Sequence, residues 1–208
     1  GGSPAAQVRV AVSTSLVPPA LPSAEADALV AGRHQDVFAR LGSHALPDGG
    51  WCVRALLPDA DAVWWCGPAG DELPMQQVHP AGLFEVRVPA PCEYQLRWQR
   101  HGSDVTAHDP YRFPSLLNAD DVYLFNEGTA ERAYRWLGAH VRQVEGVSGV
   151  HFTVWAPNAL RVSVVGDFND WDGRRHVMRK HPASGLWDIF LPDIPVLSHY
   201  KYEVLDYR

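Results

Sequence analysis

Short runs of alternating apolar and polar residues recur along the chain, with proline and glycine between them. They lie at residues 52–57, 62–66, 83–88, 94–98 and 161–165. Alternation of this kind predicts β-strands that bury one face, and the last run is also rich in β-branched side chains. Several short strands separated by turn residues are typical of antiparallel sandwiches. The pattern therefore predicts an all-β fold.

The second half of the chain repeats the order of the first. Leu-Gly-Ser-His at residues 41–44 recurs as Leu-Gly-Ala-His at 137–140, and Gly-Leu-Phe-Glu-Val at 82–86 recurs as Gly-Leu-Trp-Asp-Ile at 185–189. The separation between matched segments grows slowly along the chain, which indicates the same strand order with small loop insertions. Such a repeat predicts two structural units in tandem. We therefore expect two tandem immunoglobulin-like antiparallel β-sandwiches, with short N-terminal and connector helices.

The repeat and the breaks between runs divide the chain into five expected parts. They are a flexible arm at 1–22, a short helical segment at 23–44, a first β-sandwich at 45–113, a connector at 114–140 and a second β-sandwich at 141–208. Four prolines without any sustained period predict the arm.

Local signals add helices and a boundary to this division. Ser23 is expected to cap a helix over 24–31, and a connector helix is expected at 130–137. The segment that closes the first sandwich has no counterpart before Arg208. We therefore expect the second sandwich to be truncated and the chain to be a fragment of a longer polypeptide.

Composition and charge mainly exclude function classes. The chain has 208 residues, a hydrophobic fraction of 46% and a net charge of -6. The negative charge argues against nucleic acid as a partner, because phosphate binding needs a basic surface. No apolar run approaches the roughly 18 residues of a membrane-spanning helix, and the N-terminus lacks the order of a signal peptide. We expect no membrane partner and a cytoplasmic location.

The cysteines and histidines show no metal-binding pattern. Cys52, Cys66 and Cys92 form no C-x-x-C pair, and the ten histidines do not cluster with them. Reduced, partly buried thiols of a cytosolic protein explain these cysteines better than a disulfide or a metal site. We expect no metal and no cofactor.

The stretch at residues 164–178 carries the most specific signal. The preceding strand ends at Gly166 and Asp167, and Phe-Asn-Asp-Trp-Asp-Gly at 168–173 then supplies turn chemistry. A large aromatic side chain, Trp171, is placed at the tip among polar groups. Trp is costly to leave in water, so it either packs back over the sandwich edge or meets a ligand. The residues leave both interpretations open.

The second half resembles the family-48 carbohydrate-binding modules that precede the barrel in the α-amylase superfamily, most closely those of the glycogen branching enzymes. The resemblance is carried by Val-Trp-Ala-Pro-Asn-Ala at 154–159, Val-Ser-Val-Val-Gly-Asp-Phe-Asn at 162–169, Trp-Asp-Gly-Arg-Arg-His at 171–176 and Tyr-Lys-Tyr-Glu at 200–203.

The rest of the chain resembles the branching enzymes as well. The connector is similar through Asp-Pro-Tyr-Arg-Phe at 109–113, Asp-Asp-Val-Tyr-Leu-Phe at 120–125, Glu-Gly-Thr at 127–129 and Leu-Gly-Ala-His at 137–140. Upstream, the family string G-x-H-x-D-P-F-x-x-L-G-x-H is matched from Gly32 to His44, with Val37 in place of proline.

The resemblance implies carbohydrate contacts around the tip. An exposed aromatic ring covers the apolar face of a sugar, while polar groups bond its hydroxyl rim. In the family-48 modules of the AMP-activated kinase β subunit, the residues that match Trp171 and Lys201 contact the glucan. A second glucan-binding Trp of those modules would fall near Arg208, where this chain has none. Asn169 is a third candidate through its amide.

Each of these candidates also has an ordinary structural explanation. Tyr200 and Tyr202 share one face of the last strand, so Lys201 points to the other face, as a ligand contact requires. A solvated lysine would do the same, and turn formation alone would explain Asn169.

The resemblance further implies the accessory N-terminal region of a bacterial 1,4-α-glucan branching enzyme, whose barrel forms α-1,6 branches in glycogen. The implied partners are α-1,4-glucans such as glycogen and maltooligosaccharides, and the protein's own catalytic barrel. None of the barrel's catalytic motifs occurs within residues 1–208, so we predict no catalytic residue and no activity for this chain alone.

Three alternatives are left open by the sequence. One is a stand-alone glycogen-binding or regulatory module, and another is the front end of an isoamylase-type debranching enzyme. The tandem first sandwich argues against both. The third is a sandwich pair used only for protein contacts, since a fold alone does not fix function.

Overall fold

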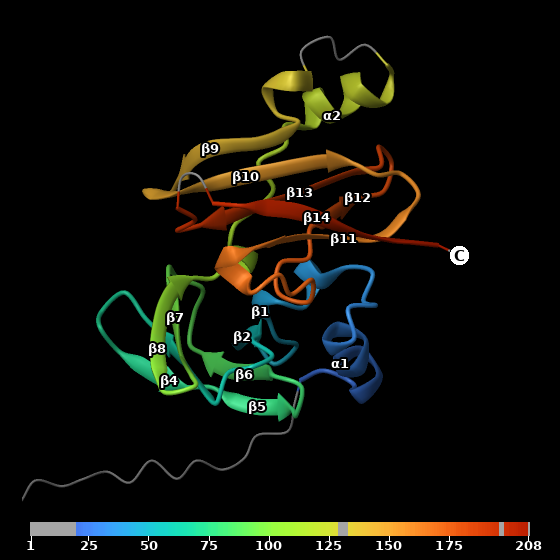
Figure 1. Cartoon of the computed structure of the whole chain (residues 1–208). Coiled ribbons are helices and arrows are strands. Elements are labelled where there is room, and N and C mark those ends of the chain that lie inside the picture. The colour runs from blue at the N-terminus through green and yellow to red at the C-terminus, as the bar shows by residue number, and fades with distance from the viewer. Residues whose placement is uncertain (1–19, 129–132, 196–197, 208) are drawn as a thin grey trace, which may run out of the picture.

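The computed structural model describes residues 20–128, 133–195 and 198–207, and Figure 1 labels its elements. Two β-sandwiches lie one above the other in this view, and the neighbouring strands in the described residues pair antiparallel. The predicted all-β class with two tandem antiparallel sandwiches is confirmed. Most of the arm expected at 1–22 lies outside the described residues.

The first sandwich is built from two four-stranded sheets. Its strands are β1 Gly42–Ala45, β2 Trp51–Leu56, β3 Ala62–Cys66, β4 Glu72–Pro74, β5 Gln76–His79, β6 Leu83–Val88, β7 Gln95–Arg100 and β8 Ser103–His108. One sheet has the order β1-β2-β6-β5 and the other β4-β3-β7-β8. The core between them buries Val53 and Phe84 from the first sheet against Trp65 and Leu96 from the second.

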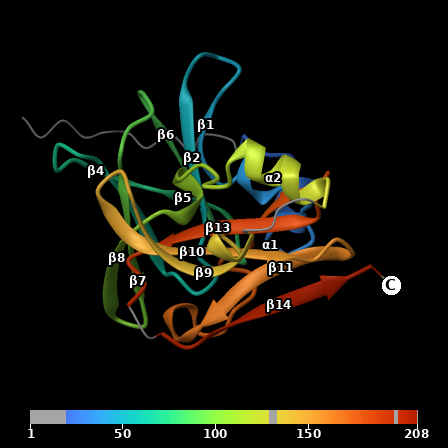
Figure 2. The same cartoon turned by 90° about the horizontal axis from the view of Figure 1, so that it is seen from above.

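The second sandwich packs a four-stranded sheet against a two-stranded one. Its strands are β9 Gly138–Val144, β10 Val147–Trp155, β11 Ala159–Gly166, β12 Arg179–His181, β13 Leu186–Pro192 and β14 Tyr200–Asp206. The sheets have the orders β12-β13-β10-β9 and β11-β14, and Figure 2 shows β14 beside β11 at the edge of the molecule. Phe152, Val162 and Trp187 are buried between them.

The two sandwiches share a strand order. Sheet β9-β10-β13-β12 repeats the order of β1-β2-β6-β5, and β11 pairs with β14 as β3 pairs with β7. The repeat read from the sequence therefore corresponds to a repeated topology.

Both sandwiches begin earlier than expected, because the repeated Leu-Gly-x-His segment is itself the start of the first strand. β1 starts at Gly42 and β9 at Gly138, ahead of the expected boundaries at residues 45 and 141. Each glycine has a φ of 88°, which residues with a Cβ rarely adopt. The histidine two positions on donates from Nε2 to the leucine carbonyl before the glycine, at 2.8 Å in the first copy and 2.7 Å in the second.

The N-terminal helical segment packs between the sandwiches. α1 spans Ser23–Val30, and the 3-10 turn η1 spans Val37–Ala39. Leu29 is buried in a cluster that also includes Val177 of the second sandwich. Ser23 is not the cap that the sequence predicts, because the helix already begins there and Pro22, which has no side-chain oxygen, holds the cap position.

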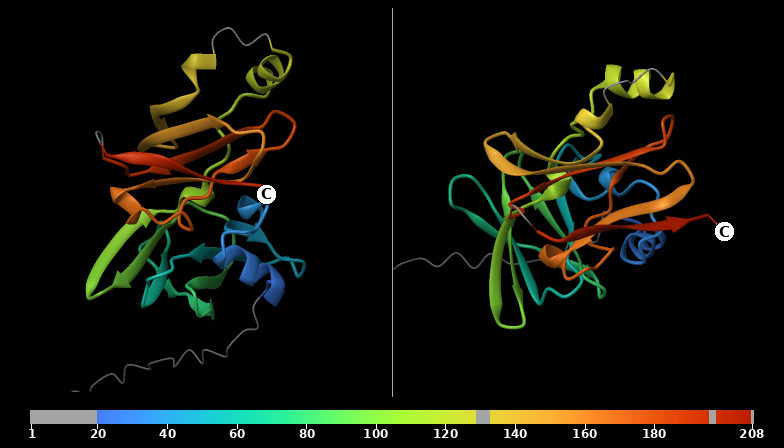
Figure 3. Two further views of the ribbon diagram at one scale, coloured as in Figure 1. Left: turned by 45° about the vertical axis from the view of Figure 1, so that its right-hand side comes forward. Right: turned by 45° about the horizontal axis from the view of Figure 1, so that its top comes forward.

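The connector carries its helix earlier than expected. α2 spans Ala119–Asn126, whereas the segment at 130–137 shows only the 3-10 turn η3, Ala133–Arg135; residues 130–132 lie outside the described part. Asn118 explains the position, because its side chain accepts the N–H of Asp120 at 2.8 Å and caps the first turn. Figures 1 and 3 place α2 on the side of the second sandwich that faces away from the first.

Tyr111 joins the two sandwiches. It lies in the 3-10 turn η2, Pro110–Arg112, where its N–H donates to Oδ1 of Asp109 at 3.0 Å. Its hydroxyl accepts the N–H of Val177 at 3.0 Å and donates to the carbonyl of Arg175 at 3.2 Å. Since Tyr111 is buried, both bonds form away from bulk water and hold the sandwiches in one arrangement.

A buried carboxylate fixes the connector to the second sandwich. Asp188 of β13 accepts hydrogen bonds from Ser115 Oγ at 3.0 Å, His151 Nε2 at 2.9 Å and His181 Nε2 at 2.6 Å. Burial alone would raise the pKa of Asp188, but the hydrogen bonds from the two histidines outweigh it and hold that pKa below its usual range. The carboxylate is therefore charged and fully partnered.

Candidate functional site

A short loop after β11 displays Trp171, and Asn169 shapes it. The strand ends at Gly166, and the 3-10 turn η4, Asp167–Asn169, follows directly. Asn169 Oδ1 accepts the N–H of Gly166 at 2.9 Å, while its Nδ2 donates to the carbonyl of Val164 at 2.8 Å. These bonds tie the loop back onto the strand from which it leaves.

Asn169 was predicted as a third sugar contact, but the loop itself already uses its amide, so we do not carry it into the proposed glucan site. Its Nδ2 also donates to Nδ1 of His176 at 2.7 Å, and Asn169 is only 1% exposed. Burial lowers the pKa of His176 to about 3, so the ring is neutral near pH 7 and Nδ1 can accept. Asn169 is a structural residue of the loop.

The tip of the loop is a turn whose two central residues have positive φ. Asp170 has a φ of 54° and Trp171 a φ of 58°, and the N–H of Asp172 donates to the carbonyl of Asn169 at 3.1 Å. This is the arrangement of a type I′ turn. Asp tolerates it, but a bulky residue rarely does, so the loop holds the Trp171 backbone in an unfavourable conformation.

Trp171 lies at the surface with a fixed ring. Its residue exposure is 42%, and its Nε1 donates to Oδ1 of Asp167 at 3.2 Å. Of the two interpretations left open by the sequence, complete burial against the sandwich edge is excluded. The exposed part of the ring is available to a ligand.

Lys201 is exposed in β14, but so are Tyr200 and Val204 on the other face of the strand, and only Tyr202 is half-buried. In the pairing with β11, Lys201 lies opposite Val165 and Tyr200 opposite Gly166. The N–H of Asp167 also donates to the carbonyl of His199 at 3.4 Å. The start of β14 and the Trp171 loop therefore lie at the same end of the two-stranded sheet.

Sequence reasoning missed Arg100, which holds this loop from the first sandwich. At the end of β7, its guanidinium forms an ion pair with Asp170 and lies 3.4 Å from Asp59. The hydrogen bond to Asp170 raises the pKa of Arg100. No sequence pattern marks this pair, because its members belong to different sandwiches and meet only in the folded chain.

The described residues contain no group of three or more His, Cys, Asp or Glu side chains that could hold a metal ion. No helix in the same part of the chain combines the length and apolar character needed to cross a membrane.

Two family models match the chain in succession. Residues 22–111 match the N-terminal domain of alpha-1,4-glucan branching enzyme GlgB, and residues 136–208 match carbohydrate-binding module 48, the isoamylase N-terminal domain. The first model covers the helical segment and first sandwich, and the second covers the sandwich with the Trp171 loop.

Curated relatives agree with both models. The chain is 50% identical over 184 residues to the 1,4-alpha-glucan branching enzyme GlgB of Nitrosospira multiformis, covering 85% of this chain and 24% of the relative. It is also 50% identical over 184 residues to the enzyme of the same name from Paramagnetospirillum magneticum, covering 88% and 25%. The chain thus spans about a quarter of the length of these relatives.

Similarity to solved structures is more distant. A product complex of the glycogen-degrading pneumococcal virulence factor SpuA matches with a TM-score of 0.30 and 20% identity, over 41% of this chain and 10% of that one. A pullulanase from Anoxybacillus matches with a TM-score of 0.28 and 15% identity, over 79% and 24%.

Proposed function

We propose that the chain is the accessory N-terminal part of a 1,4-alpha-glucan branching enzyme. The support is that residues 22–111 match the N-terminal domain of these enzymes and residues 136–208 match carbohydrate-binding module 48. The whole enzyme would form α-1,6 branches in glycogen with a catalytic domain outside these residues. The chain itself would bind α-1,4-glucan and support that domain.

Trp171 and Lys201 are the proposed glucan contacts. The observation that carries this proposal is the surface ring of Trp171, whose backbone is fixed by the turn and whose Nε1 is fixed by Asp167. A rigid aromatic surface loses little entropy when it covers the apolar face of a sugar. Lys201, at the same end of the sheet, would donate to the hydroxyl rim.

Native gel electrophoresis through glycogen tests this proposal. Glycogen should retard the unaltered chain, Trp171→Ala should migrate as it does without glycogen, and Lys201→Ala should be retarded less. Trp155→Ala is the matched control, because Trp155 is 57% exposed on another surface, beside α2. Equal retardation of the Trp171→Ala variant and the unaltered chain would refute the proposed contact.

A second surface supports the proposed bracing role. Large apolar side chains are exposed on and beside α2, η3, β9 and the end of β10, and they are Tyr123, Leu124, Tyr134, Val141 and Trp155. Contiguous exposed apolar groups mark interaction surfaces. We assign this surface to the catalytic domain of the same protein. Val141→Asp should then lower the thermal stability of the whole enzyme and leave glycogen binding by this chain unchanged.

A cytoplasmic location is also proposed. The three cysteines are free thiols in the structure, which suits a reducing compartment. Burial raises the pKa of the Cys52 thiol to about 12, so this cysteine is unreactive and serves as a small core residue.

A further inference from the structure

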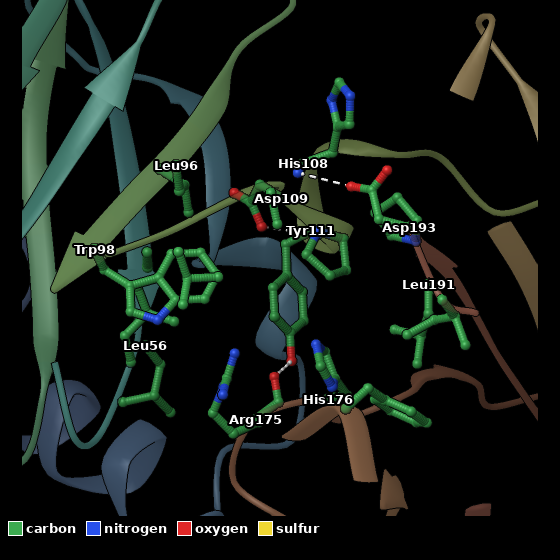
Figure 4. Close-up of a pocket in the computed structure, with 18 residues that line it drawn as sticks. Leu56, Leu96, Trp98, His108, Asp109, Tyr111, Arg175, His176, Leu191 and Asp193 are labelled. Carbon is green, nitrogen blue, oxygen red and sulfur yellow. Dashed lines mark hydrogen bonds between the residues drawn. The ribbon is translucent and has the colours of Figure 1, made fainter. Parts of the chain in front are cut away.

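A cavity of about 150 Å³ lies where the two sandwiches meet. Leu56, Leu96 and Trp98 line it from the first sandwich, and His176 and Leu191 from the second (Figure 4). Apolar cavities of about 150 Å³ can hold a molecule the size of benzene. The volume and the walls therefore suit a compact ligand with an apolar body.

The guanidinium of Arg175 faces this cavity without an acidic partner. In Figure 4 it points into the space between Trp98 and Tyr111. Among the described residues its side chain contacts the Trp98 ring, at 5.7 Å from the centroid, and takes part in no ion pair. The neighbouring carboxylates are occupied, since Asp172 pairs with Arg174 and Asp170 pairs with Arg100.

Arg175 is partly buried, and the fully buried Arg54 shows how this chain can pair an arginine away from water. Arg54 is 4% exposed, and its Nη2 lies 2.8 Å from Oε1 of Glu85. Removing a guanidinium from water without a partner costs free energy that a counter-ion normally offsets. Burial lowers the pKa of Arg175, whereas the ion pair with Asp170 raises that of Arg100. Among the described residues, Arg175 thus lacks the carboxylate partner that Arg54 and Arg100 have; Arg179 also has no ion pair, but its guanidinium donates to the carbonyl of Phe113.

The far side of the cavity sets the orientation of a ligand. Asp193 lines that side, and its Oδ2 accepts the N–H of His108 at 3.1 Å. A second carboxylate would be repelled there, so the anionic group of a ligand belongs at Arg175. The Tyr111 hydroxyl is already engaged by Val177 and the Arg175 carbonyl.

We propose that this cavity binds a small organic carboxylate, with its carboxylate on the guanidinium of Arg175 and its apolar body between Trp98 and Leu191. The site is separate from the proposed glucan contacts, because neither Trp171 nor Lys201 lines the cavity. A ligand that touches both sandwiches stabilises their docked arrangement by mass action.

Calorimetry and thermal unfolding with acetate, butyrate and benzoate test the proposal, with benzamide as the neutral counterpart of benzoate. At least one carboxylate should raise the melting temperature of the chain. Benzoate should bind at least about tenfold tighter than benzamide, because a bidentate carboxylate–guanidinium pair is lost in the amide.

Two variants test whether the rise in melting temperature with carboxylate depends on Arg175. Arg175→Met should lose the carboxylate effect while keeping or raising the melting temperature without ligand, since it removes an unpaired charge. Arg174→Met is the matched control, because Arg174 is paired with Asp172, and it should keep the effect. If Arg175→Met does not fold, Arg175→Lys replaces it and should weaken binding, because lysine lacks the planar fork.

Three results would overturn the proposal. They are the absence of any shift with all three carboxylates, equal binding of benzoate and benzamide, and undiminished binding of benzoate by the Arg175 variant that folds.

Discussion

Arg100 of the first sandwich and Asp170 of the second form an ion pair at the tip of the turn that displays Trp171. Asp170 and Trp171 are consecutive residues with positive φ, and such conformations cost roughly 1 kcal/mol or more each. An anchor from the neighbouring sandwich therefore offsets part of this strain. The ring that the second sandwich presents to a ligand depends on a residue of the first.

Arg100→Met should weaken maltooligosaccharide binding by up to about fivefold, because a partly exposed ion pair contributes up to about 1 kcal/mol. The loss of binding in Arg100→Met should come entirely from the lost ion pair with Asp170. Titration calorimetry on Arg100→Met, Asp170→Asn and the double variant should show that the double variant binds no more weakly than either single one. Arg97→Met, which removes the two ion pairs of another β7 arginine with Glu72 and Asp104, should bind as the unaltered chain does. Additive losses would contradict the coupling.

Asn169→Ala should lower the free energy of unfolding by about 2–3 kcal/mol. The substitution leaves the buried N–H of Gly166 and the carbonyl of Val164 without a side-chain partner, and an unsatisfied buried group costs about 1–3 kcal/mol. Urea unfolding measures this loss. A variant that is fully stable yet cannot bind glucan would instead restore Asn169 as a ligand contact.

Two buried groups make stability depend on pH in opposite directions. Burial lowers the pKa of His176 from its usual 6.5 to about 3 in the folded chain, so its contribution to stability is complete above pH 6.5 and is lost as pH falls. Burial raises the pKa of Asp109 from 3.8 to about 6, so its contribution is complete below pH 3.8 and is lost as pH rises toward 6. From pH 6.5 to 5, His176 therefore removes about 2 kcal/mol while Asp109 restores about 1 kcal/mol.

When one of the two groups is replaced, the pH dependence of stability should show the effect of the other group alone. Asp109→Asn should lose about 2 kcal/mol between pH 6.5 and 5, and His176→Gln should gain about 1 kcal/mol over the same step. Urea unfolding of both variants at pH 6.5 and at pH 5 measures these changes in the free energy of unfolding. Identical slopes in the two variants would show that neither buried group controls acid stability.

The sequence predicts those parts of the fold that depend on local pattern. Alternation located β2, β3, β6 and β7, and the internal repeat predicted a second copy of the same strand order. The connector helix was misplaced, because the capping side chain of Asn118 decides its start and the apolar pattern does not.

The candidate site was predictable only in part. Turn chemistry placed Trp171 in a surface loop, where the structure has it, but strand alternation did not predict that β14 is exposed on both faces. Neither signal could show that Asn169 turns inward to three partners, or that Arg100 reaches the loop from the other sandwich. The first depends on bonds within one irregular loop and the second on a contact between the sandwiches, and neither follows a period along the chain.

The repeated Leu-Gly-x-His segments provide a matched test of the junction between the sandwiches. Gly42 and Gly138 have the same φ of 88°, but their surroundings differ. A Cβ at Gly42 would lie 2.5 Å from the carbonyl oxygen of Tyr111, whereas a Cβ at Gly138 would have no neighbour within 4 Å.

Gly138→Ala should therefore lower the free energy of unfolding by about 1–2 kcal/mol, which is the cost of placing a residue with a Cβ at positive φ. Gly42→Ala should cost about 3 kcal/mol or more, because the clash is added and the backbone of Tyr111 must move. The displacement should also disturb the hydrogen bond that the N–H of Val177 donates to the Tyr111 hydroxyl, so the two sandwiches should unfold in separate steps in the Gly42 variant. Urea unfolding followed by tryptophan fluorescence measures both quantities. Equal losses in the two variants would show that Tyr111 does not constrain the start of β1, and the junction would then have to be held by other contacts.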